Sequence, residues 1–309
     1  MKVLFVGFGS IAQKHKNAMD VSFPGTQYFA LRSSQASKAI DGVESLFSWD
    51  EIPAGIDFAI VSNPTAHHTE AMHELVDRGI PVMIEKPVSD RLDGLEELAS
   101  KIRSKQLPVY VACNLRFAPV LQFLHDKLQG TEVRINEVLV YAGSYLPDWR
   151  PGTNFRENYS ARADMGGGAH LDLFHELDYV TWLFGKPQSS SSTLRSVSSL
   201  GITAVDFASY TWEYPGFTAT ILLNYFRRKP KRSIEIVLAE DTWLVDILQS
   251  RITSDNGEVI YDEGPYNLKD TYIAQIQYFV EAVKQKKYLN INTFEDSLQI
   301  LKNCLHSNA

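Results

Sequence analysis

The sequence predicts an α/β protein of two domains, in which a doubly wound parallel sheet precedes an α+β domain with an open, largely antiparallel sheet. Three observations support this prediction. The chain has 309 residues, its first third alternates short apolar runs with helical stretches, and its later part carries strand-like runs in succession. Because this length suits two hydrophobic cores better than one, we place the domains at 1–119 and 120–309.

The first third alternates strands with helices. Short apolar runs typical of buried parallel strands occur at Lys2–Val6, Gln27–Leu31, Asp57–Val61, Val82–Ile84 and Val109–Ala112. Helical patterns lie between some of them, at Thr65–Arg78 and Asp90–Arg103. Strands that alternate with helices of this length are typical of right-handed βαβ units, so we expect a doubly wound sheet.

The pattern changes after about Pro119. We expect a helix as far as Leu128, a strand at Val133–Tyr145, a polar loop at Pro147–Asp164 and a helix that ends near Phe184. The remaining elements are strands at Ser190–Val197, Ile202–Glu213, Phe217–Phe226 and Ser233–Leu238, then helices at Thr271–Lys286 and Thr293–Leu305. Consecutive strands without helices between them indicate a largely antiparallel sheet.

The sheet of the second domain is expected to contact another copy of the chain. Its strands carry large apolar residues on both alternations in places, for example Phe207, Tyr210, Trp212, Ile221, Leu223 and Tyr225. A sheet with helices on one face leaves the other face open, and an exposed apolar patch of that size usually marks an interface. We therefore expect a homodimer or homotetramer; the alternative is a face covered by the C-terminal helices.

Composition limits the partners and the compartment. The net charge is −7, which disfavours a nucleic-acid partner because phosphate backbones need a basic face. Cys113 and Cys304 have no metal-ligand spacing and make no disulfide framework, so we expect no metal and a reducing, cytoplasmic location. The apolar run at Lys2–Val6 turns glycine-rich too soon for a signal peptide, and no run approaches the ~20 apolar residues of a membrane span.

A glycine-rich loop follows the first predicted strand. Gly7-Phe8-Gly9-Ser10-Ile11-Ala12 reads G-x-G-x-x-A and leads into a helix. The first glycine allows the tight turn, the second lets a pyrophosphate approach the backbone, and the small alanine permits close packing of helix on strand. Free N–H groups of Ser10 and Ile11 at the helix start would face the phosphates. The segment predicts a dinucleotide site; the alternative is a purely structural turn.

The end of the second predicted strand indicates which dinucleotide binds. An NAD enzyme usually places Asp or Glu there to accept the ribose hydroxyls, but here no carboxylate occurs before Asp41. Arg32, Ser33 and Ser34 occupy the position instead and suit a 2′-phosphate. We therefore expect NADP as the cofactor, with NAD as the second possibility; the alternative for Arg32 is a solvated loop residue.

Three further segments carry a family resemblance. Asn63-Pro64-Thr65-Ala66-His67-His68 follows the third predicted strand, Glu85-Lys86-Pro87 follows the fourth, and Gly166-Gly167-Gly168 leads into a helix that contains Asp172 and His175. Together with the glycine loop, this order resembles the glucose–fructose oxidoreductase and inositol dehydrogenase (Gfo/Idh/MocA) family over nearly the whole chain.

The resemblance implies a Rossmann domain, a substrate domain and particular site residues. Lys86 matches a lysine that touches both nicotinamide and substrate, and Asp172 with His175 matches the acidic residue and the histidine that contact substrate and carry the proton. The cofactor positions that it implies are Asn63, Pro64, His68, Glu85 and Asn114. We add Arg116, Tyr145, Trp149 and Tyr159 as candidates for substrate binding, since this polar and aromatic set could grip a sugar, its phosphate or nucleotide, or a partner subunit.

One departure from the family pattern affects the proton carrier. The family commonly has D-x-x-x-H, whereas His175 lies three residues after Asp172. A helix still places residues i and i+3 on one face, so the two side chains can converge. His170 or Glu176 could share the role. Branches with a similar D-x-x-H-E-x-D stretch resemble enzymes of surface-glycan synthesis.

These residue types suit hydride transfer to or from a sugar, a cyclitol or a nucleotide-linked sugar. Histidine titrates near neutrality and can carry the hydroxyl proton, and a lysine can polarise the carbonyl oxygen. Because Lys86 and His175 lie in different predicted domains, we expect the active site in the cleft between the domains. Two alternatives remain: a non-catalytic NADP-binding regulatory protein of the same fold, and an enzyme whose tightly held cofactor cycles between two substrates.

Overall fold

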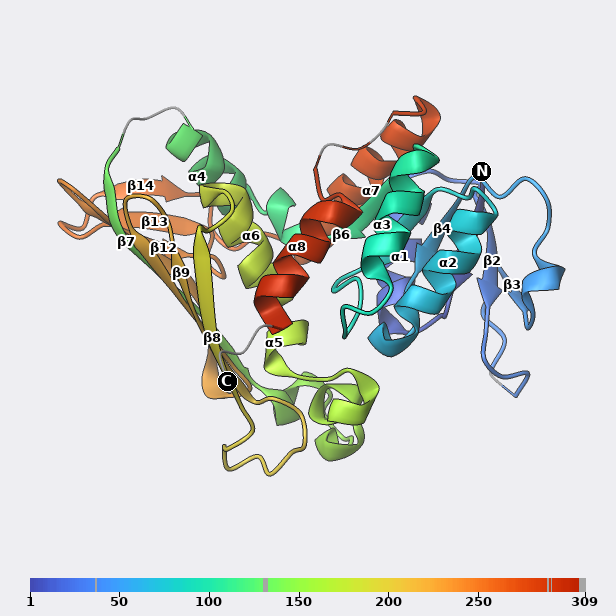
Figure 1. The fold of residues 1–309 in the computed structure, drawn as a ribbon, viewed down its shortest axis with the longest axis horizontal. Helices are drawn as coiled ribbons and strands as arrows, with labels where there is room; N and C mark the ends of the chain where they lie inside the picture. Colours follow the sequence, from blue (N-terminus) through green and yellow to red (C-terminus); the bar gives the residue numbers. More distant parts are fainter. Residues whose placement is uncertain (37, 130–132, 288, 290, 306–309) are drawn as a thin grey trace. The chain divides into compact units, whose positions relative to one another are not determined.

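The protein consists of two compact units (Figure 1). The computed structural model describes residues 1–36, 38–129, 133–287, 289 and 291–305. The first unit comprises Met1–Asn114 and Leu268–Leu301, and the second comprises Leu115–Asn267 with the described part of Lys302–Ala309.

The first unit is built on a parallel sheet of six strands, as the alternating pattern predicted. The strands are β1 (Lys2–Val6), β2 (Gln27–Leu31), β3 (Val43–Leu46), β4 (Phe58–Val61), β5 (Val82–Glu85) and β6 (Val109–Ala112). Their spatial order is β3-β2-β1-β4-β5-β6, which is the order of a Rossmann sheet. The order reverses between β1 and β4, and such sheets bind ligands outside the carboxyl ends of their strands at that point.

Helices pack on this sheet in two pairs. They are α1 (Ser10–Ser22), α2 (His68–Asp77), α3 (Leu95–Ser104) and α7 (Leu268–Lys284), with most of α8 (Phe294–Leu305) in the same unit. Helix α1 packs against α7, and α2 packs against α3. Phe279 of α7 lies edge-on to Phe58 of β4, with ring centroids 5.2 Å apart, and both side chains are fully buried. Helix α7 therefore contributes to the core of the first unit.

The segment Leu268–Leu301 belongs to the first unit, which differs from the expected division of the chain between residues 119 and 120. The expected boundary assigns both C-terminal helices to the second domain, whereas in the structure the first unit ends its first segment at Asn114 and takes up α7. Besides the contact of Phe279, the Asn292 carbonyl accepts a hydrogen bond from the N–H of Val111 on β6 (2.8 Å). These apolar and backbone contacts at the sheet hold the C-terminal segment there.

The second unit is built on a mixed, mostly antiparallel sheet of eight strands. The strands are β7 (Ile135–Tyr145), β8 (Ser189–Arg195), β9 (Phe207–Glu213), β10 (Thr218–Asn224), β11 (Phe226–Leu238), β12 (Thr242–Asp246), β13 (Arg251–Ser254) and β14 (Val259–Asp262). Their order is β14-β13-β12-β11-β7-β10-β9-β8, and β7 runs parallel to β10. The helices of this unit are α4 (Pro119–Gln129), α5 (Ala169–Asp172) and α6 (Phe174–Phe184). The predicted antiparallel character is confirmed.

Alternation along these strands separates a buried face from a more open one. Tyr210, Trp212, Ile221, Leu223 and Tyr225 are all at most 1% exposed. The residues that we expected at a subunit contact are thus core residues of a single chain, apart from Phe207, which is partly buried. The opposite face carries Leu139, which is 37% exposed, and Leu244, which is 43% exposed. Any contact of this sheet with another copy would use that second face.

One local expectation differs from the structure. The sequence suggests one helix through Asp172 and His175, but α5 ends at Asp172 and α6 begins at Phe174, because Leu173 has a non-helical backbone (φ −95°, ψ 34°). The i, i+3 argument for Asp172 and His175 on one helical face therefore does not apply. Within the described ranges, no helix combines the length and the apolar character needed to cross a membrane.

Candidate functional site

The glycine-rich loop forms a tight turn at the carboxyl end of β1. Gly7 has φ +79°, and a Cβ added there would lie 2.7 Å from the Cα of Asn63, so only glycine fits without a shift of the backbone. Its N–H donates to the carbonyl of Leu31 on β2 (2.9 Å). A Cβ added at Gly9 would meet no protein atom within 4 Å, and Ala12 is fully buried. The loop thus leaves open space beside Gly9 while packing closely elsewhere.

The start of α1 presents unpaired donors to this space. The first intrahelical bond runs from the N–H of Gln13 to the carbonyl of Gly9 (3.1 Å), and no side chain caps the helix. The N–H groups of the first turn, which include those of Ser10 and Ile11, therefore have no intrahelical acceptor. The Oδ1 atom of Asn63 is buried and has no hydrogen-bond partner in the described residues. This cradle fits the pyrophosphate of a dinucleotide.

Arg32 lies directly after β2, at the position that sequence reasoning assigned to the ribose. Its Nη1 donates to the carbonyl of Lys38 (2.6 Å) and is 3.5 Å from Oγ of Ser45. Ser33 and Ser34 are exposed, and the hydroxyl of Ser34 accepts from the N–H of Ala36 (3.2 Å). The guanidinium is partly buried and anchored at one nitrogen, so its other N–H groups are oriented rather than freely rotating.

Lys86 lies in a turn after β5 that two buried histidines hold in place. The first is His15 of α1, which is fully buried and whose Nε2 is 2.5 Å from Oε1 of Glu85. The other carboxylate oxygen of Glu85 accepts from the backbone N–H of Lys86 (3.3 Å). The ring of Tyr272 on α7 lies edge-on to the His15 ring, 5.5 Å between centroids. Glu85 is thus used to position the lysine turn from within the protein.

The second histidine is His68, at the start of α2. Its Nδ1 is 2.9 Å from the carbonyl oxygen of Pro87, and its Nε2 is 3.0 Å from the carbonyl oxygen of Asn63. Burial lowers the pKa of His68 below its ordinary value, although the two backbone carbonyls oppose that shift. The side chain joins the loop after β4 to the loop after β5. Pro64, by contrast, is exposed at the surface of its loop.

Asn114 and Arg116 are held by protein partners. The Asn114 amide nitrogen donates to the hydroxyl of Thr271 in α7 (2.7 Å), and both residues are buried. In the second unit, Arg116 binds Asp178 of α6 through two parallel bonds, Nε–Oδ2 at 2.9 Å and Nη2–Oδ1 at 2.7 Å. A buried bidentate pair of this kind satisfies the guanidinium internally. Its geometry favours a structural role for Arg116 over substrate binding.

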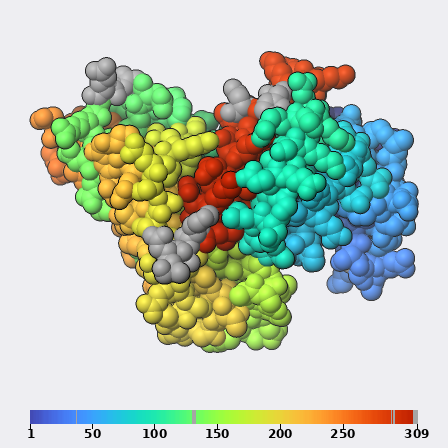
Figure 2. Space-filling view, in the orientation of Figure 1, coloured from blue at the N-terminus to red at the C-terminus, as the bar shows by residue number. Residues whose placement is uncertain are grey.

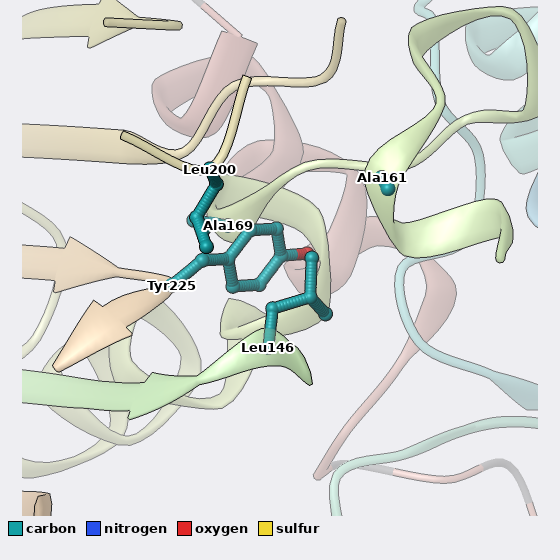
Figure 3. Packing of buried hydrophobic residues seen from close by; sticks show 5 residues of the cluster. All are labelled: Leu146, Ala161, Ala169, Leu200 and Tyr225. Carbon is teal, nitrogen blue, oxygen red and sulfur yellow. The ribbon is translucent and has the colours of Figure 1, made fainter. Parts of the chain in front are cut away.

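Asp172 lies at the end of α5, where two tyrosine hydroxyls meet its carboxylate. Tyr159 donates to Oδ1 (3.0 Å) and Tyr225 donates to Oδ2 (2.5 Å). Burial, and secondarily the charge of Asp172, raises the pKa of both tyrosines, so both stay protonated donors at neutral pH. Figure 3 shows the Tyr225 ring beside Leu146, Ala169 and Leu200, and Ala161 belongs to the same buried cluster. Asp172 is therefore a fixed carboxylate at the end of α5.

The histidines and carboxylates after the glycine triplet differ in their surroundings. His175 is partly exposed on the first turn of α6. His170 is 7% exposed, and burial lowers its pKa to about 4, against the opposing charge of Asp172. Glu176 is fully buried and forms an ion pair with Arg232 (Nε–Oε1 2.7 Å). A side chain that carries protons near neutrality needs access to solvent and a pKa near 7. His170 has neither, and Glu176 is fully buried and so lacks access.

Two of the aromatic loop candidates contact Tyr225 or the cluster that holds it. Trp149 is 38% exposed, its indole N–H donates to the hydroxyl of Ser144 (2.8 Å), and its ring lies edge-on to Tyr225 with centroids 5.3 Å apart. Tyr145 is partly buried and packs against the same cluster as Tyr225. Trp149 and Tyr145 therefore lie around Tyr225, which together with Tyr159 binds Asp172.

A separate pocket lies on the same loop. Its volume is about 570 Å³. The residues that line it are Arg156, Glu157, Ala161–Asp164 and Gly201–Thr203. Figure 2 shows these green and yellow segments side by side on the surface. Its arginines already have partners: Arg156 donates to the carbonyl of Leu200 (2.8 Å), and Arg162 pairs with Asp164. The pocket thus offers little unpaired charge to a ligand.

Sequence reasoning missed two residues of these clusters. His15 stands alone on an amphipathic helix, and nothing in its local pattern connects it with Glu85 on a distant strand. The alternation along its strand assigns Tyr225 to an exposed sheet face, whereas its ring is fully buried and its hydroxyl binds Asp172. The hydroxyl is the one signal that distinguishes Tyr225 from its aliphatic neighbours, because a buried tyrosine usually finds a polar partner.

Comparison with known proteins gives the class to which this fold and site belong. The description "Oxidoreductase family, NAD-binding Rossmann fold" matches residues 1–113, and "GFO/IDH/MocA C-terminal domain" matches residues 132–243. Together the two matches cover most of the chain. The chain belongs to the GFO/IDH/MocA oxidoreductase family, as the motifs predicted.

Individual relatives are distant. A scyllo-inositol 2-dehydrogenase (NAD(+)) of Bacillus subtilis is 22% identical over 60% of this chain and 55% of its own length. A levoglucosan dehydrogenase solved with NADH and levoglucosan has a TM-score of 0.82 at 15% identity, covering 98% of this chain and 95% of that one. A UDP-N-acetylglucosamine 3-dehydrogenase from Acidithiobacillus ferrooxidans has a TM-score of 0.80 at 17% identity, covering 99% and 96%. The matches span 43% to 62% of the first curated relatives' lengths.

Proposed function

We propose that this protein is a nicotinamide-dependent oxidoreductase that transfers a hydride between the cofactor and a hydroxyl or keto carbon of a sugar-type substrate. One observation carries the proposal. The carboxyl ends of β1 and β5, which are separated by β4, lie at the same edge of one sheet. An open phosphate cradle at Gly9 follows β1, and the turn of Lys86 follows β5. Two buried histidines hold that turn in place. A cation held beside a dinucleotide cradle suits the stabilisation of an alkoxide as it forms.

Each protein group has a distinct role in this reaction. The bound nicotinamide supplies the hydride or accepts it. The ammonium of Lys86 stabilises the negative charge that develops on the substrate oxygen, and His175 takes the hydroxyl proton in oxidation or returns it in reduction. Asp172, which Tyr159 and Tyr225 hold in place, accepts a hydrogen bond from a second substrate hydroxyl and so sets the orientation of the ring.

The substrate class follows from the receptor groups and from the relatives. Aromatic side chains beside a fixed carboxylate, as at Trp149 and Asp172, are suited to the apolar face and the hydroxyls of a sugar ring. A relative in sequence is named for scyllo-inositol, and solved proteins with this fold are named for levoglucosan and UDP-N-acetylglucosamine. Action on a CH–OH group and a place in surface-glycan synthesis are parts of the same proposal.

The cofactor is proposed to be NADP, with NAD as the alternative. Arg32, Ser33 and Ser34 offer donors where a carboxylate would repel a 2′-phosphate. A non-catalytic cofactor-binding regulator would need the same cradle but no proton carrier. The presence of Lys86, Asp172 and His175 together favours an enzyme over a non-catalytic regulator.

We also propose a homodimer or homotetramer that uses the open face of the second unit's sheet, with Leu139 and Leu244 in the contact. Light scattering at micromolar concentration should then give a multiple of the chain mass. A monomer would contradict this part of the proposal.

The experiment that tests the function is a screen for cofactor turnover. The purified protein is supplied with NADP⁺ or NAD⁺ and a panel of sugars, cyclitols and nucleotide-linked sugars, while the absorbance of reduced nicotinamide is followed. We expect at least one member of the panel to produce reduced cofactor, and Lys86→Ala to abolish the signal. Tight cofactor binding without turnover in either direction would favour the regulatory alternative.

A further inference from the structure

A run of positive charge interrupts the register between β11 and β7. Phe226 pairs with Tyr145 and Lys231 pairs with Gly143, so four residues of β11 lie opposite the single residue Ser144. The segment Arg227–Lys231, here called the basic bulge, reads Arg-Arg-Lys-Pro-Lys. The Arg227 side chain donates from Nε to the carbonyl of Lys229 (3.0 Å), which stabilises the distortion. Bulges of this kind often turn side chains toward a functional site.

The charges of the basic bulge are not neutralised within the described part of the chain. Arg232, the next residue, pairs with the buried Glu176. Among the described residues, no carboxylate forms an ion pair with Arg227, Arg228, Lys229 or Lys231. Arg228, Lys229 and Lys231 are exposed, and Arg227 is partly exposed. Arg227 and Lys231 lie over the ring of Tyr141, at 5.0 and 5.3 Å from its centre, but neither contact neutralises their charge. Four cations without a carboxylate partner within five residues are notable in a chain of net charge −7, because like charges repel unless an anion is present.

The basic bulge lies next to the residues assigned to the substrate. The guanidinium carbon of Arg228 is 3.8 Å from the centre of the Tyr145 ring, which packs on the cluster that holds Tyr225. Tyr225 in turn binds Asp172 through its hydroxyl. Ser144, opposite the bulge, accepts the indole N–H of the exposed Trp149. A continuous series of contacts therefore joins the basic bulge to the fixed carboxylate.

We propose that the basic bulge binds a phosphate or diphosphate group of the substrate, so that the substrate is a phosphorylated or nucleotide-linked sugar rather than a neutral sugar or cyclitol. This inference rests on the proposed function, since it assigns a substrate class to the same site. Arginine and lysine bind phosphate oxygens through charge-assisted hydrogen bonds, and stacking on tyrosine holds the guanidinium of Arg228 in a fixed orientation. The ring of a sugar phosphate would then lie between the basic bulge and Asp172.

Binding of inorganic pyrophosphate tests the inference independently of turnover. The full chain is first saturated with NADPH, which occupies the glycine cradle, and pyrophosphate is then titrated by calorimetry. We expect wild type to bind pyrophosphate and the double variant Arg228→Gln/Lys231→Gln to bind it at least about tenfold more weakly. Lys186→Gln, which removes an exposed lysine elsewhere in the second unit, serves as the matched control and should bind as wild type does.

The source of the phosphate is distinguished by comparing glucose 1-phosphate with UDP in the same titration. Tighter binding of UDP indicates a nucleotide-linked substrate, and tighter binding of glucose 1-phosphate indicates a sugar phosphate. Either result supports the inference if the double variant binds that ligand more weakly than wild type does. Equal binding by wild type and the double variant would overturn it. So would a change of the double variant's mass in light scattering, because the basic bulge would then contact another subunit.

The two proposals can fail separately. If a sugar is turned over but pyrophosphate, glucose 1-phosphate and UDP bind wild type and the double variant equally, the oxidoreductase assignment stands and the phosphate site is refuted. If pyrophosphate binds at the basic bulge but no sugar of any kind supports cofactor turnover, the phosphate site stands and the proposed function fails.

Discussion

The Nε2 atom of His15 lies 2.5 Å from Oε1 of Glu85, and this buried contact joins α1 to the turn that carries Lys86. Because α1 also begins the dinucleotide cradle, one pair of side chains connects the cofactor loop with the proposed electrostatic group. His15 has no exposed surface, and Glu85 is 9% exposed. The contact is therefore protected from water and sensitive to the loss of either partner.

Removal of one partner should destabilise the protein and misplace the lysine. His15→Ala leaves a buried carboxylate without its partner, and such a change costs about 3–5 kcal/mol of unfolding free energy. A replacement of both, His15→Leu/Glu85→Met, should recover much of that stability because no unpaired charge remains. Turnover should stay at least about tenfold below wild type in the double variant, since the bond that positions Lys86 is absent. Denaturant melts and kcat measured together separate the two effects; wild-type kcat in the double variant would contradict a positioning role.

Arg32 should determine the choice of cofactor. A charge-assisted hydrogen bond contributes about 1.5–3 kcal/mol, so Arg32→Ala should weaken NADPH binding by roughly ten- to a hundredfold. NADH has no 2′-phosphate, and its affinity should hardly change. Titration of cofactor fluorescence with both nucleotides gives the ratio directly, and equal affinities in the wild type would refute the assignment.

Removal of the Tyr225 hydroxyl should lower kcat/KM, although the residue lies in the hydrophobic core. Tyr225→Phe keeps the buried ring but removes one of two donors to Asp172, so the carboxylate becomes free to move. We expect kcat/KM to fall about tenfold, on the scale of one charge-assisted hydrogen bond. Tyr214→Phe, which removes a hydroxyl that donates to the carbonyl of Gly185 (3.2 Å), is the matched control and should leave kcat/KM near wild type. Equal effects of the two substitutions would show that the hydroxyl of Tyr225 is merely structural.

His170 should make the fold sensitive to acid. Its folded-state pKa is lowered to about 4, whereas the unfolded chain binds the proton near the ordinary value of about 6.5. The stabilisation is therefore complete above pH ~6.5 and is lost as pH falls toward 4, amounting to at most about 3 kcal/mol. His170→Gln should flatten the dependence of unfolding free energy on pH in that window. His67→Gln, at an exposed histidine, should keep the wild-type slope, and a wild-type slope in both variants would argue against a neutral, buried His170.

The sequence predicted the first unit well because its signals are local. The apolar runs of β1, β2 and β6 and the G-x-G-x-x-A turn each occupy a few consecutive residues. Strand β3 (Val43–Leu46) escaped notice since it lies at the sheet edge and only one of its residues is buried. The return of α7 to the first unit depends on a contact between Phe279 and Phe58, which no local pattern reveals.

The sequence was enough to select the candidate site residues, but it did not reveal which protein groups they contact. The motif residues Lys86, Asp172 and His175 needed no structure to be selected. Arg116 pairs with Asp178, His68 contacts the carbonyl of Pro87, and Glu85 contacts His15. These partners are distant in the sequence, so no local pattern reveals the contacts. The break at Leu173 separates Asp172 from the helix of His175, and a run of good helix formers gives no warning of it.

The central claim, hydride transfer with His175 as proton carrier and Lys86 as electrostatic group, is tested most directly by the turnover of two variants. On the substrate that the screen identifies, His175→Ala and Lys86→Ala should each lower kcat by at least about a hundredfold, with cofactor affinity nearly unchanged for the histidine variant. Because both groups would serve one transition state, the double variant should lose less than the product of the two single effects. Wild-type turnover in His175→Ala would contradict the account and transfer the proton role to another residue.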